Sequence, residues 1–321
     1  MGSTAVKDLA ASPQVEELVI ADHNLEEAER LASELGDKVR AVQVDANDHV
    51  SLVQAIRGFD VAIGTVGPFY KYESRMIKAC IDAGVNYVSI CDDYDAAEEA
   101  LSLDGQAVEA GITAVTGVGW TPGITNVLAR LAADQLDEVE EIAISWGCHA
   151  SDTAGKAVTL HYLHAVTGMI PTYRDGRITY VPAGSGLERV RFPEPVGAID
   201  VFHAGHPEPI TMPRFINART VTLKGGLVEE YLVKLCNALV KLRLTDTPYK
   251  KDLVGNFFNR VLPYLEDLGR PPETCSACRV DVTGKVGGRW THLVYGAAAH
   301  MDVLTGIPAS VGVQLVGEGK G

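Results

Sequence analysis

The stretch ELVIADHNLEEAERLASELGDKVRAVQVD, residues 17–45, decides the fold class. Residues 17–22 form an apolar run that ends in a polar turn, which is typical of a strand. Residues 24–36 carry apolar side chains at helical spacing and stop at Gly36, and residues 39–45 again favour a strand. Strand, helix and strand in so short a stretch predict a right-handed crossover between parallel strands.

The same alternation continues to about residue 136. Further strands are expected at 60–66, 85–91 and 112–117, and further helices at 48–58, 72–84, 95–111 and 121–136. This pattern predicts an α/β fold with a Rossmann-like, doubly wound parallel sheet. We expect this first domain to cover residues 1–123, with residues 299–321 returning to it.

The second half has a different pattern. A strand is expected at 139–147 and helices at 155–168, 227–244, 252–268 and 308–317. Short extended runs at 171–226 are broken by Gly and Pro, and runs at 278–284 and 290–297 flank the hairpin signal Gly287-Gly288. We therefore expect residues 124–298 to form a second, mixed α/β (α+β) domain for substrate binding and dimerisation.

Composition excludes several classes of protein. With 28 Lys and Arg against 42 Asp and Glu, the formal net charge is −14, which argues against nucleic-acid binding and against anchoring on anionic lipid. The uncharged stretch 110–129 contains four Gly and Pro122, so it is no membrane helix. The absence of a visible signal peptide and the six Cys predict a cytoplasmic protein.

Polar and Gly-rich residues recur where the predicted parallel strands end. They are Asp22-His23, Asp45-Ala46, Thr65-Val66-Gly67-Pro68-Phe69-Tyr70, Cys91-Asp92-Asp93 and Gly117-Val118-Gly119-Trp120. Ligands bind beyond the carboxyl ends of such strands. Turns also collect Gly, Asp and Pro for conformational reasons, and that alternative explains any one of the five segments.

The start of the chain predicts dinucleotide binding. Gly2 opens an expected helix as the last Gly of a G-x-G-x-x-G pattern, while the preceding strand and the first two glycines are expected to be missing. Asp22 follows Gly2 by 20 residues, where a ribose-binding acid is expected. Its charge would repel a 2′-phosphate, so the sequence favours NAD over NADP, although His23 would soften that preference.

The chain resembles the saccharopine dehydrogenase superfamily, and within it the lysine 6-dehydrogenase-like proteins. The resemblance is carried by VIADHNLEEAERLA (19–32), VDAND (44–48), GPFY (67–70), AGVNYVSICDD (83–93), AGITAVTGVGWTPGITNVLA (110–129), QLDEVEEI (135–142) and GHPEPITMPR (205–214). It implies an NAD(P)-dependent oxidoreductase that acts on a C–N bond of a small-molecule amino acid, usually as a homodimer. The family's C-terminal extension is also expected to be missing, and no Arg stands in the loop 205–208, which argues against saccharopine itself.

The resemblance also implies positions for the cofactor. Gly2 and Ser3 fall on the pyrophosphate turn, Asp22 and His23 on the ribose, and Asp45 and Ala46 beside the adenine. Thr65, Val66, Gly67, Pro68 and Phe69 would run under the nicotinamide ribose. Cys91, Gly119 and Trp120 would wall the reacting end.

Oxidation of an amine needs a base for the ammonium proton. Asp92 and Asp93 are candidates for that base or for an ammonium anchor, with Tyr70 and His206 as further candidates. The alternative for the two acids is capping of the helix that starts near Tyr94.

The substrate contacts expected are Arg214, His149 and Thr211. Arg214 would bind a carboxylate, and a surface salt bridge is its alternative. A buried His with satisfied hydrogen bonds is the alternative for His149.

No metal is expected. His161 and His164 share a helix face but lack an evident third ligand, and Cys275 and Cys278 lack a second pair. Two further functions stay open: a catalytically inactive NAD-binding protein that acts as a sensor or assembly partner, and an oxidoreductase that acts on an unrelated carbonyl.

Overall fold

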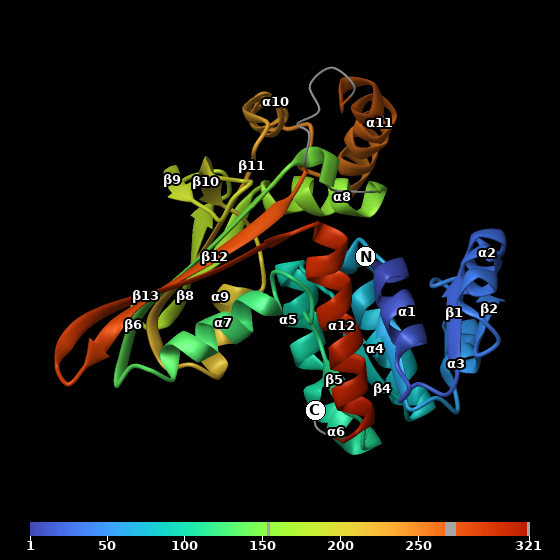
Figure 1. Cartoon of the computed structure of the whole chain (residues 1–321). Coiled ribbons are helices and arrows are strands. Elements are labelled where there is room, and N and C mark those ends of the chain that lie inside the picture. The colour runs from blue at the N-terminus through green and yellow to red at the C-terminus, as the bar shows by residue number, and fades with distance from the viewer. Residues whose placement is uncertain (153–154, 267–273, 320–321) are drawn as a thin grey trace. The chain divides into compact units, whose positions relative to one another are not determined.

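The computed structural model describes residues 1–152, 155–266 and 274–319 (Figure 1). Contacts divide the chain into two compact units. Unit 1 contains Met1–Cys91, Asp95–Trp120 and Asp302–Gly321, and unit 2 contains Asp92–Tyr94 and Thr121–Met301. The short segment Asp92–Tyr94 thus groups with the second half of the chain.

Unit 1 alternates helices and short parallel strands. In chain order the elements are α1 (Gly2–Ala11), β1 (Leu18–Asp22), α2 (Leu25–Leu35), β2 (Val39–Gln43), α3 (His49–Ile56), β3 (Val61–Gly64), α4 (Phe69–Ala83), β4 (Asn86–Ser89), α5 (Tyr94–Ser102), α6 (Asp104–Ala110), β5 (Ala114–Val115) and α12 (Met301–Gly317). The α/β alternation and the parallel pairing predicted from the sequence are confirmed.

Three details of unit 1 differ from the prediction. The parallel strands form two sheets, β1-β2 and β3-β4-β5, because among the described residues no pairing joins β1 or β2 to β3. The single helix expected at 95–111 is broken at Leu103, which caps α6. Helix α12 begins at Met301 and contains Pro308, which the sequence analysis had placed at the helix start.

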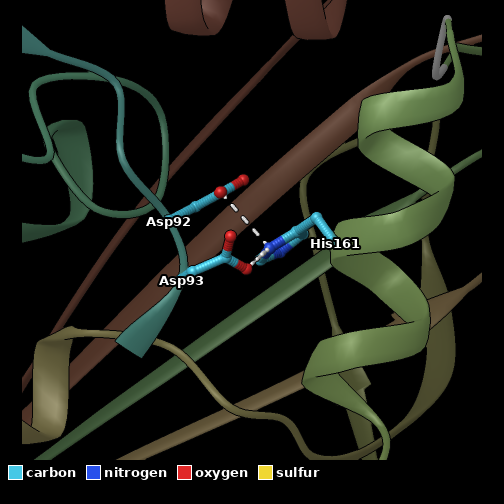
Figure 2. Close-up of side chains that lie close together, drawn as sticks. All are labelled: Asp92, Asp93 and His161. Carbon is cyan, nitrogen blue, oxygen red and sulfur yellow. Dashed lines mark hydrogen bonds and ion pairs between the residues drawn. The ribbon is translucent and has the colours of Figure 1, made fainter. Parts of the chain in front are cut away.

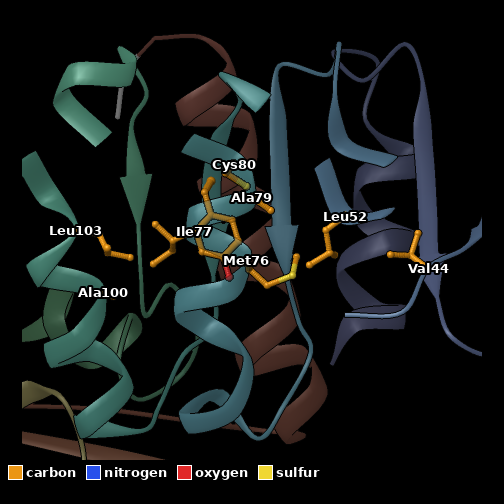
Figure 3. Packing of buried hydrophobic residues seen from close by; sticks show 9 residues of the cluster. Val44, Leu52, Met76, Ile77, Ala79, Cys80, Ala100 and Leu103 are labelled. Carbon is orange, nitrogen blue, oxygen red and sulfur yellow. The ribbon is translucent and has the colours of Figure 1, made fainter. Parts of the chain in front are cut away.

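Side-chain packing and capping explain why unit 1 folds this way. A buried apolar cluster joins α3, α4, β4 and α5 (Figure 3), and its members are Val44, Leu52, Met76, Ile77, Ala79, Cys80, Tyr87, Ala100 and Leu103. Two helices begin at side-chain caps, since Asn24 Oδ1 accepts from the backbone N–H of Glu27 and Asp48 Oδ1 accepts from those of Val50 and Ser51.

Unit 2 is built on a large mixed sheet. Its elements are α7 (Ile124–Ala133), β6 (Glu138–Cys148), η1 (Ala150–Asp152), α8 (Lys156–Ala165), β7 (Met169–Arg174), β8 (Arg177–Pro182), β9 (Glu188–Arg191), β10 (Ala198–His203), α9 (Glu208–Thr211), η2 (Met212–Arg214), β11 (Ala218–Leu227), α10 (Glu230–Lys241), α11 (Pro248–Glu266), β12 (Ser276–Val286) and β13 (Arg289–Ala299). The last residues of the helix predicted at 252–268, 267 and 268, lie outside the described residues.

The strand order β13-β12-β6-β11-β10-β9 gives the sheet two chemically different faces. Because side chains alternate along a strand, Ile142, Ile144, Val221 and Val280 share one face, and all four are buried. The β6–β11 pair is parallel and the other pairs are antiparallel, which confirms the mixed sheet that the sequence predicted. Across the described ranges, no helix is long and apolar enough to cross a membrane.

Candidate functional site

A cluster of titratable side chains lies inside unit 2. The segment after β4 supplies Asp92 and Asp93, and α8 supplies His161. Figure 2 shows both carboxylates pointing toward the imidazole of His161. The Nδ1 atom of His161 lies 2.8 Å from Asp93 Oδ1 and 3.2 Å from Asp92 Oδ1. One imidazole therefore bridges two adjacent carboxylates.

The other ring nitrogen of His161, Nε2, faces a second buried histidine, His206. His161 Nε2 lies 3.3 Å from His206 Nε2, and the two rings meet edge to face at 87°. His206 Nδ1 lies 3.7 Å from Glu208 Oε2. Glu208 Oε1 accepts hydrogen bonds from Thr121 Oγ1 at 2.5 Å and Thr125 Oγ1 at 3.1 Å. We call Asp92, Asp93, His161, His206 and Glu208 the relay cluster.

A glycine allows the loop that carries His206 to approach this cluster. A Cβ at Gly205 would lie 2.8 Å from the ring of Tyr94 and 2.9 Å from Ile170. The backbone N–H of Gly205 donates to the carbonyl of Ala165, at the end of α8. Only a residue without a side chain fits between these neighbours, so Gly205 fixes His206 against α8.

Neighbouring charges and burial shift the pKa values of His161 and His206 in opposite directions. Burial by itself would lower the pKa of His161, but the charges of Asp92 and Asp93 and the hydrogen bond to Asp93 outweigh it and raise the pKa to about 9. The pKa of His206 is lowered well below its usual value, by burial first and then by the charge of His161. At neutral pH His161 is an imidazolium and His206 a neutral imidazole.

Two of the carboxyl groups have raised pKa values for the same physical reason. Burial raises the pKa of Asp92 to about 7, assisted by repulsion from Asp93 and opposed by His161. Burial likewise raises the pKa of Glu208 to about 7, against the hydrogen bonds from Thr121 and Thr125. The cluster can therefore take up or release a proton near neutral pH, as general acid–base catalysis requires.

Three of these residues also form a possible cation site. One ligand atom each from Asp92, Asp93 and His161 lies within 4.8 Å of the others. Helical spacing pairs His161 only with His164, whose Nδ1 instead lies 2.7 Å from Lys251 Nζ and whose ring stacks on Tyr94. The expectation that no metal binds stays a prediction, but its premise that His161 lacks further ligands is wrong. The acids come from a distant segment, so helical spacing did not reveal them.

Of the predicted catalytic residues, Asp92, Asp93 and His206 come together in the relay cluster. Sequence reasoning missed the roles of His161 and Glu208. Glu208 stands two residues after His206 in the quoted stretch GHPEPITMPR, which is the signal that was available. Tyr70 lies in α4 of unit 1, with its ring 5.7 Å from Lys71 Nζ.

The predicted substrate contacts lie elsewhere in unit 2. His149 Nδ1 lies 2.9 Å from the carbonyl of Cys275 and accepts from its backbone N–H. Thr211 donates to the carbonyl of Pro207, and Arg214 is exposed in η2. In the described chain, none of these three has a hydrogen bond or ion pair with the relay cluster, so their substrate roles stay predictions.

The predicted cofactor residues of unit 1 lie where parallel strands end. Asp22 closes β1, and its Oδ1 lies 2.9 Å from His23 Nδ1 on the exposed surface. Gly2 begins α1 beside Thr65, so a Cβ there would lie 2.8 Å from Thr65 Oγ1. The rest follow β2, β3, β4 and β5 in the order expected: Asp45, Ala46, Val66, Gly67, Pro68, Phe69, Cys91, Gly119 and Trp120. Ser3 is exposed on α1. Gly2 at the start of α1 and Asp22 at the end of β1 thus stand where a dinucleotide site was expected, and their cofactor roles stay predictions.

A buried carboxylate ties these strand ends together. Glu73 of α4 is 1% exposed and accepts hydrogen bonds from Tyr87 Oη at 2.9 Å, Ser89 Oγ at 2.5 Å and Thr116 Oγ1 at 2.9 Å. Ser89 ends β4 and Thr116 follows β5. Glu73 therefore holds the segments that lead to Cys91 and Gly117.

Residues 1–115 match the family model described as the saccharopine dehydrogenase NADP binding domain. The match covers the parallel strands β1 to β5 and the Gly2, Asp22 and Glu73 positions described above.

Two curated relatives and one solved structure extend the comparison. The carboxynorspermidine synthase of Vibrio cholerae is 25% identical over 71% of this chain and 56% of that protein. The chain therefore spans little more than half the length of this relative. The carboxyaminopropylagmatine dehydrogenase of Synechocystis is 23% identical over 100% of this chain and 87% of that protein. An amine dehydrogenase structure from Mycobacterium smegmatis shares the fold, with a TM-score of 0.53, 11% identity, and coverage of 98% of this chain and 89% of that one.

Proposed function

We propose that the protein is an NAD(P)-dependent dehydrogenase that acts on the C–N bond of an amine bearing an amino-acid group. The observation that carries this proposal is the buried relay cluster, in which His161 holds a proton between Asp93 and His206. The family of residues 1–115 supports a dinucleotide cofactor. Self-association as a homodimer and a cytoplasmic location belong to the same proposal.

The relatives favour a different amine from the one that the resemblance suggested. The names of the two curated relatives refer to carboxynorspermidine and carboxyaminopropylagmatine rather than to lysine. We therefore take the substrate to be a carboxylated polyamine-type amine. Its positive charge suits the acidic cluster of Asp92, Asp93 and Glu208.

The relay cluster supplies the proton chemistry that this reaction requires. A dinucleotide held by unit 1 would supply the hydride acceptor or donor. In the oxidative direction an amine must lose a proton, which Asp92 can accept because its pKa is about 7. In the reductive direction His161, which carries a proton at neutral pH, is the donor of the cluster, and its contact with Asp93 orients the ring. The neutral His206 lies between His161 and the carboxyl group of Glu208.

Asp22 governs the choice between NAD and NADP in this proposal. Its carboxylate stands at the end of β1, where it would bind ribose hydroxyls and repel a 2′-phosphate. A protonated His23, 2.9 Å from Asp22 Oδ1, would offset part of that repulsion. NAD is therefore the proposed cofactor, within a family that is named for NADP binding.

The test is a turnover assay of the purified protein. Carboxynorspermidine, carboxyaminopropylagmatine, lysine and saccharopine are each offered with NAD or NADP, and formation of the reduced nicotinamide is followed by absorbance. We expect turnover with a carboxylated polyamine and loss of turnover in His161→Gln. Nucleotide binding without turnover of any of these amines, in either direction, would contradict the proposal.

A further inference from the structure

The polar face of the mixed sheet in unit 2 contains a cavity of about 430 Å³. Its floor comes from alternate residues of the three central strands, including Ser145 of β6, Thr222 of β11 and Thr283 of β12. The intervening residues Ile142 and Leu223 point to the opposite face and are buried. The cavity and the relay cluster therefore lie on opposite faces of the sheet, and the relay cluster is on the apolar face, where Trp146 of β6 contacts His206.

The cavity is locally basic in an acidic chain. Five basic side chains line it, Arg174, Arg189, Arg191, Lys224 and Arg279, against the three acidic residues Glu141, Glu188 and Asp281. The net charge of the whole chain is −14. A basic side chain in a concave site raises the local concentration of anions where no carboxylate neutralises it.

Ion pairs neutralise part of this lining but leave Arg174 available. Lys224 Nζ lies 2.6 Å from Glu188 Oε2, and Arg279 Nε lies 2.7 Å from Asp281 Oδ2. Arg189 and Arg191 are also paired, with Asp200 at 3.1 Å and with Glu194 at 3.7 Å. Arg174 Nη2 lies 3.4 Å from His203 Nε2. Within the ranges that the structure describes, Arg174 has no ion pair with a carboxylate. Its planar guanidinium can therefore bind an oxyanion through two parallel hydrogen bonds.

The floor adds neutral donors. In the parts of the chain described, the hydroxyls of Ser145, Thr220 and Thr222 make no hydrogen bond to the protein, although Ser145 is 6% exposed. Hydroxyl groups can donate to an oxyanion, as they do in many anion sites. Arg174 and these hydroxyls together provide the hydrogen-bond donors that an oxyanion site requires.

We propose that this cavity binds a small oxyanion, a phosphate or carboxylate group of a free metabolite, between Arg174 and the Ser and Thr hydroxyls of the sheet floor. The site is distinct from the relay cluster and does not depend on the proposed function. The ligand class follows from Arg174, whose guanidinium offers only N–H donors, and from the neighbouring hydroxyls, which can each donate an O–H.

The test is isothermal titration of the whole protein with inorganic phosphate and, separately, with citrate, at constant ionic strength set with chloride. We expect saturable binding that weakens about tenfold or more in Arg174→Gln, because a charged hydrogen-bond partner is lost. Arg177→Gln is the matched control, since Arg177 faces Arg174 across the β7–β8 hairpin but does not line the cavity. A second variant, Thr222→Val, should weaken binding several-fold.

Three outcomes would overturn the inference. The first is that the wild-type protein binds neither anion beyond the chloride control, and the second is that Arg174→Gln and Arg177→Gln lose affinity equally. In the third outcome neither anion binds and Arg174→Gln changes the oligomeric state, which would make this face an interface between copies of the chain. Turnover by Arg174→Gln at the wild-type rate would show that loss of anion binding is separate from loss of the proposed dehydrogenase activity.

Discussion

The Nε2 atoms of His161 and His206 lie 3.3 Å apart in the interior of unit 2. At this separation only one of the two nitrogens can carry a hydrogen, because two N–H groups would repel each other. The raised pKa of His161, set by Asp92 and Asp93 against burial, and the lowered pKa of His206 assign that hydrogen to His161. The pair is therefore a directed donor–acceptor contact, with His161 as the donor.

Replacing His161 should remove most of the catalytic rate. We expect His161→Gln to lower kcat by about 100-fold or more, the range of a lost general acid or base. His164→Gln is the matched control, because His164 lies on the same helix but contacts Tyr94 and Lys251. The two variants are compared by steady-state kinetics with the best amine, and equal losses of kcat would contradict the role of His161.

Replacing Glu208 should change how stability depends on pH. The folded protein holds the pKa of Glu208 at about 7, above the usual 4.5, so between these values the native state binds more protons than the unfolded state. The contribution of this group to stability is therefore present below pH 4.5 and is lost as the pH rises through about 7.

Glu208→Gln lacks this titration and keeps an oxygen for Thr121 Oγ1. Relative to wild type it should gain about 1–3 kcal/mol of unfolding free energy between about pH 5 and about pH 8. Denaturant unfolding at both pH values measures the gain. A stability difference that stays constant over this range would show that Glu208 is ionised throughout.

Replacing Asp22 should shift the choice of cofactor. Asp22→Asn removes the charge that repels a 2′-phosphate, so the ratio of NADPH to NADH affinity should rise by about tenfold, the effect of about 1.4 kcal/mol. Glu26→Gln, in the first turn of α2, is the matched control for overall charge. Fluorescence titration with both nucleotides gives the ratio, and equal shifts in the two variants would exclude a specific role for Asp22.

Removing the buried carboxylate of unit 1 should destabilise the fold. Glu73→Ala leaves Tyr87, Ser89 and Thr116 without their acceptor and opens a cavity, which should cost about 3–5 kcal/mol. Glu99→Ala, which removes an exposed partner of Lys78, should change stability by less than about 0.5 kcal/mol. Thermal unfolding distinguishes them, and a small effect of Glu73→Ala would mean that its partners find other acceptors.

Local sequence patterns were sufficient for the elements and for the fold class. The 3.6-residue spacing of apolar positions in residues 24–36 predicted α2, and the caps Asn24 and Asp48 lie where the pattern placed the helix starts. The apolar runs predicted β1 to β4 to within a few residues. These features depend on neighbours along the chain, so periodicity and turn chemistry reveal them.

Only part of the candidate site could be predicted from the sequence, because the site depends on contacts between segments that are distant along the chain. Asp92 and Asp93 were expected beside a strand end, and His206 on a loop, but nothing local connects them to His161. The spacing of His161 and His164 pointed to the wrong pair, because helical periodicity reports which residues share a face and not what that face meets. Glu208 reads as an ordinary surface acid until its 0% exposure is known.

The sequence by itself determined the alternation of strands and helices, the acidic charge and the residues at the ends of the parallel strands, because these properties follow from composition and local spacing. Only the tertiary structure decided that residues 92–93, 161 and 206–208 meet in one buried cluster and that His161, rather than His206, is the charged histidine. Burial and charge proximity set those pKa values, and both are properties of long-range packing.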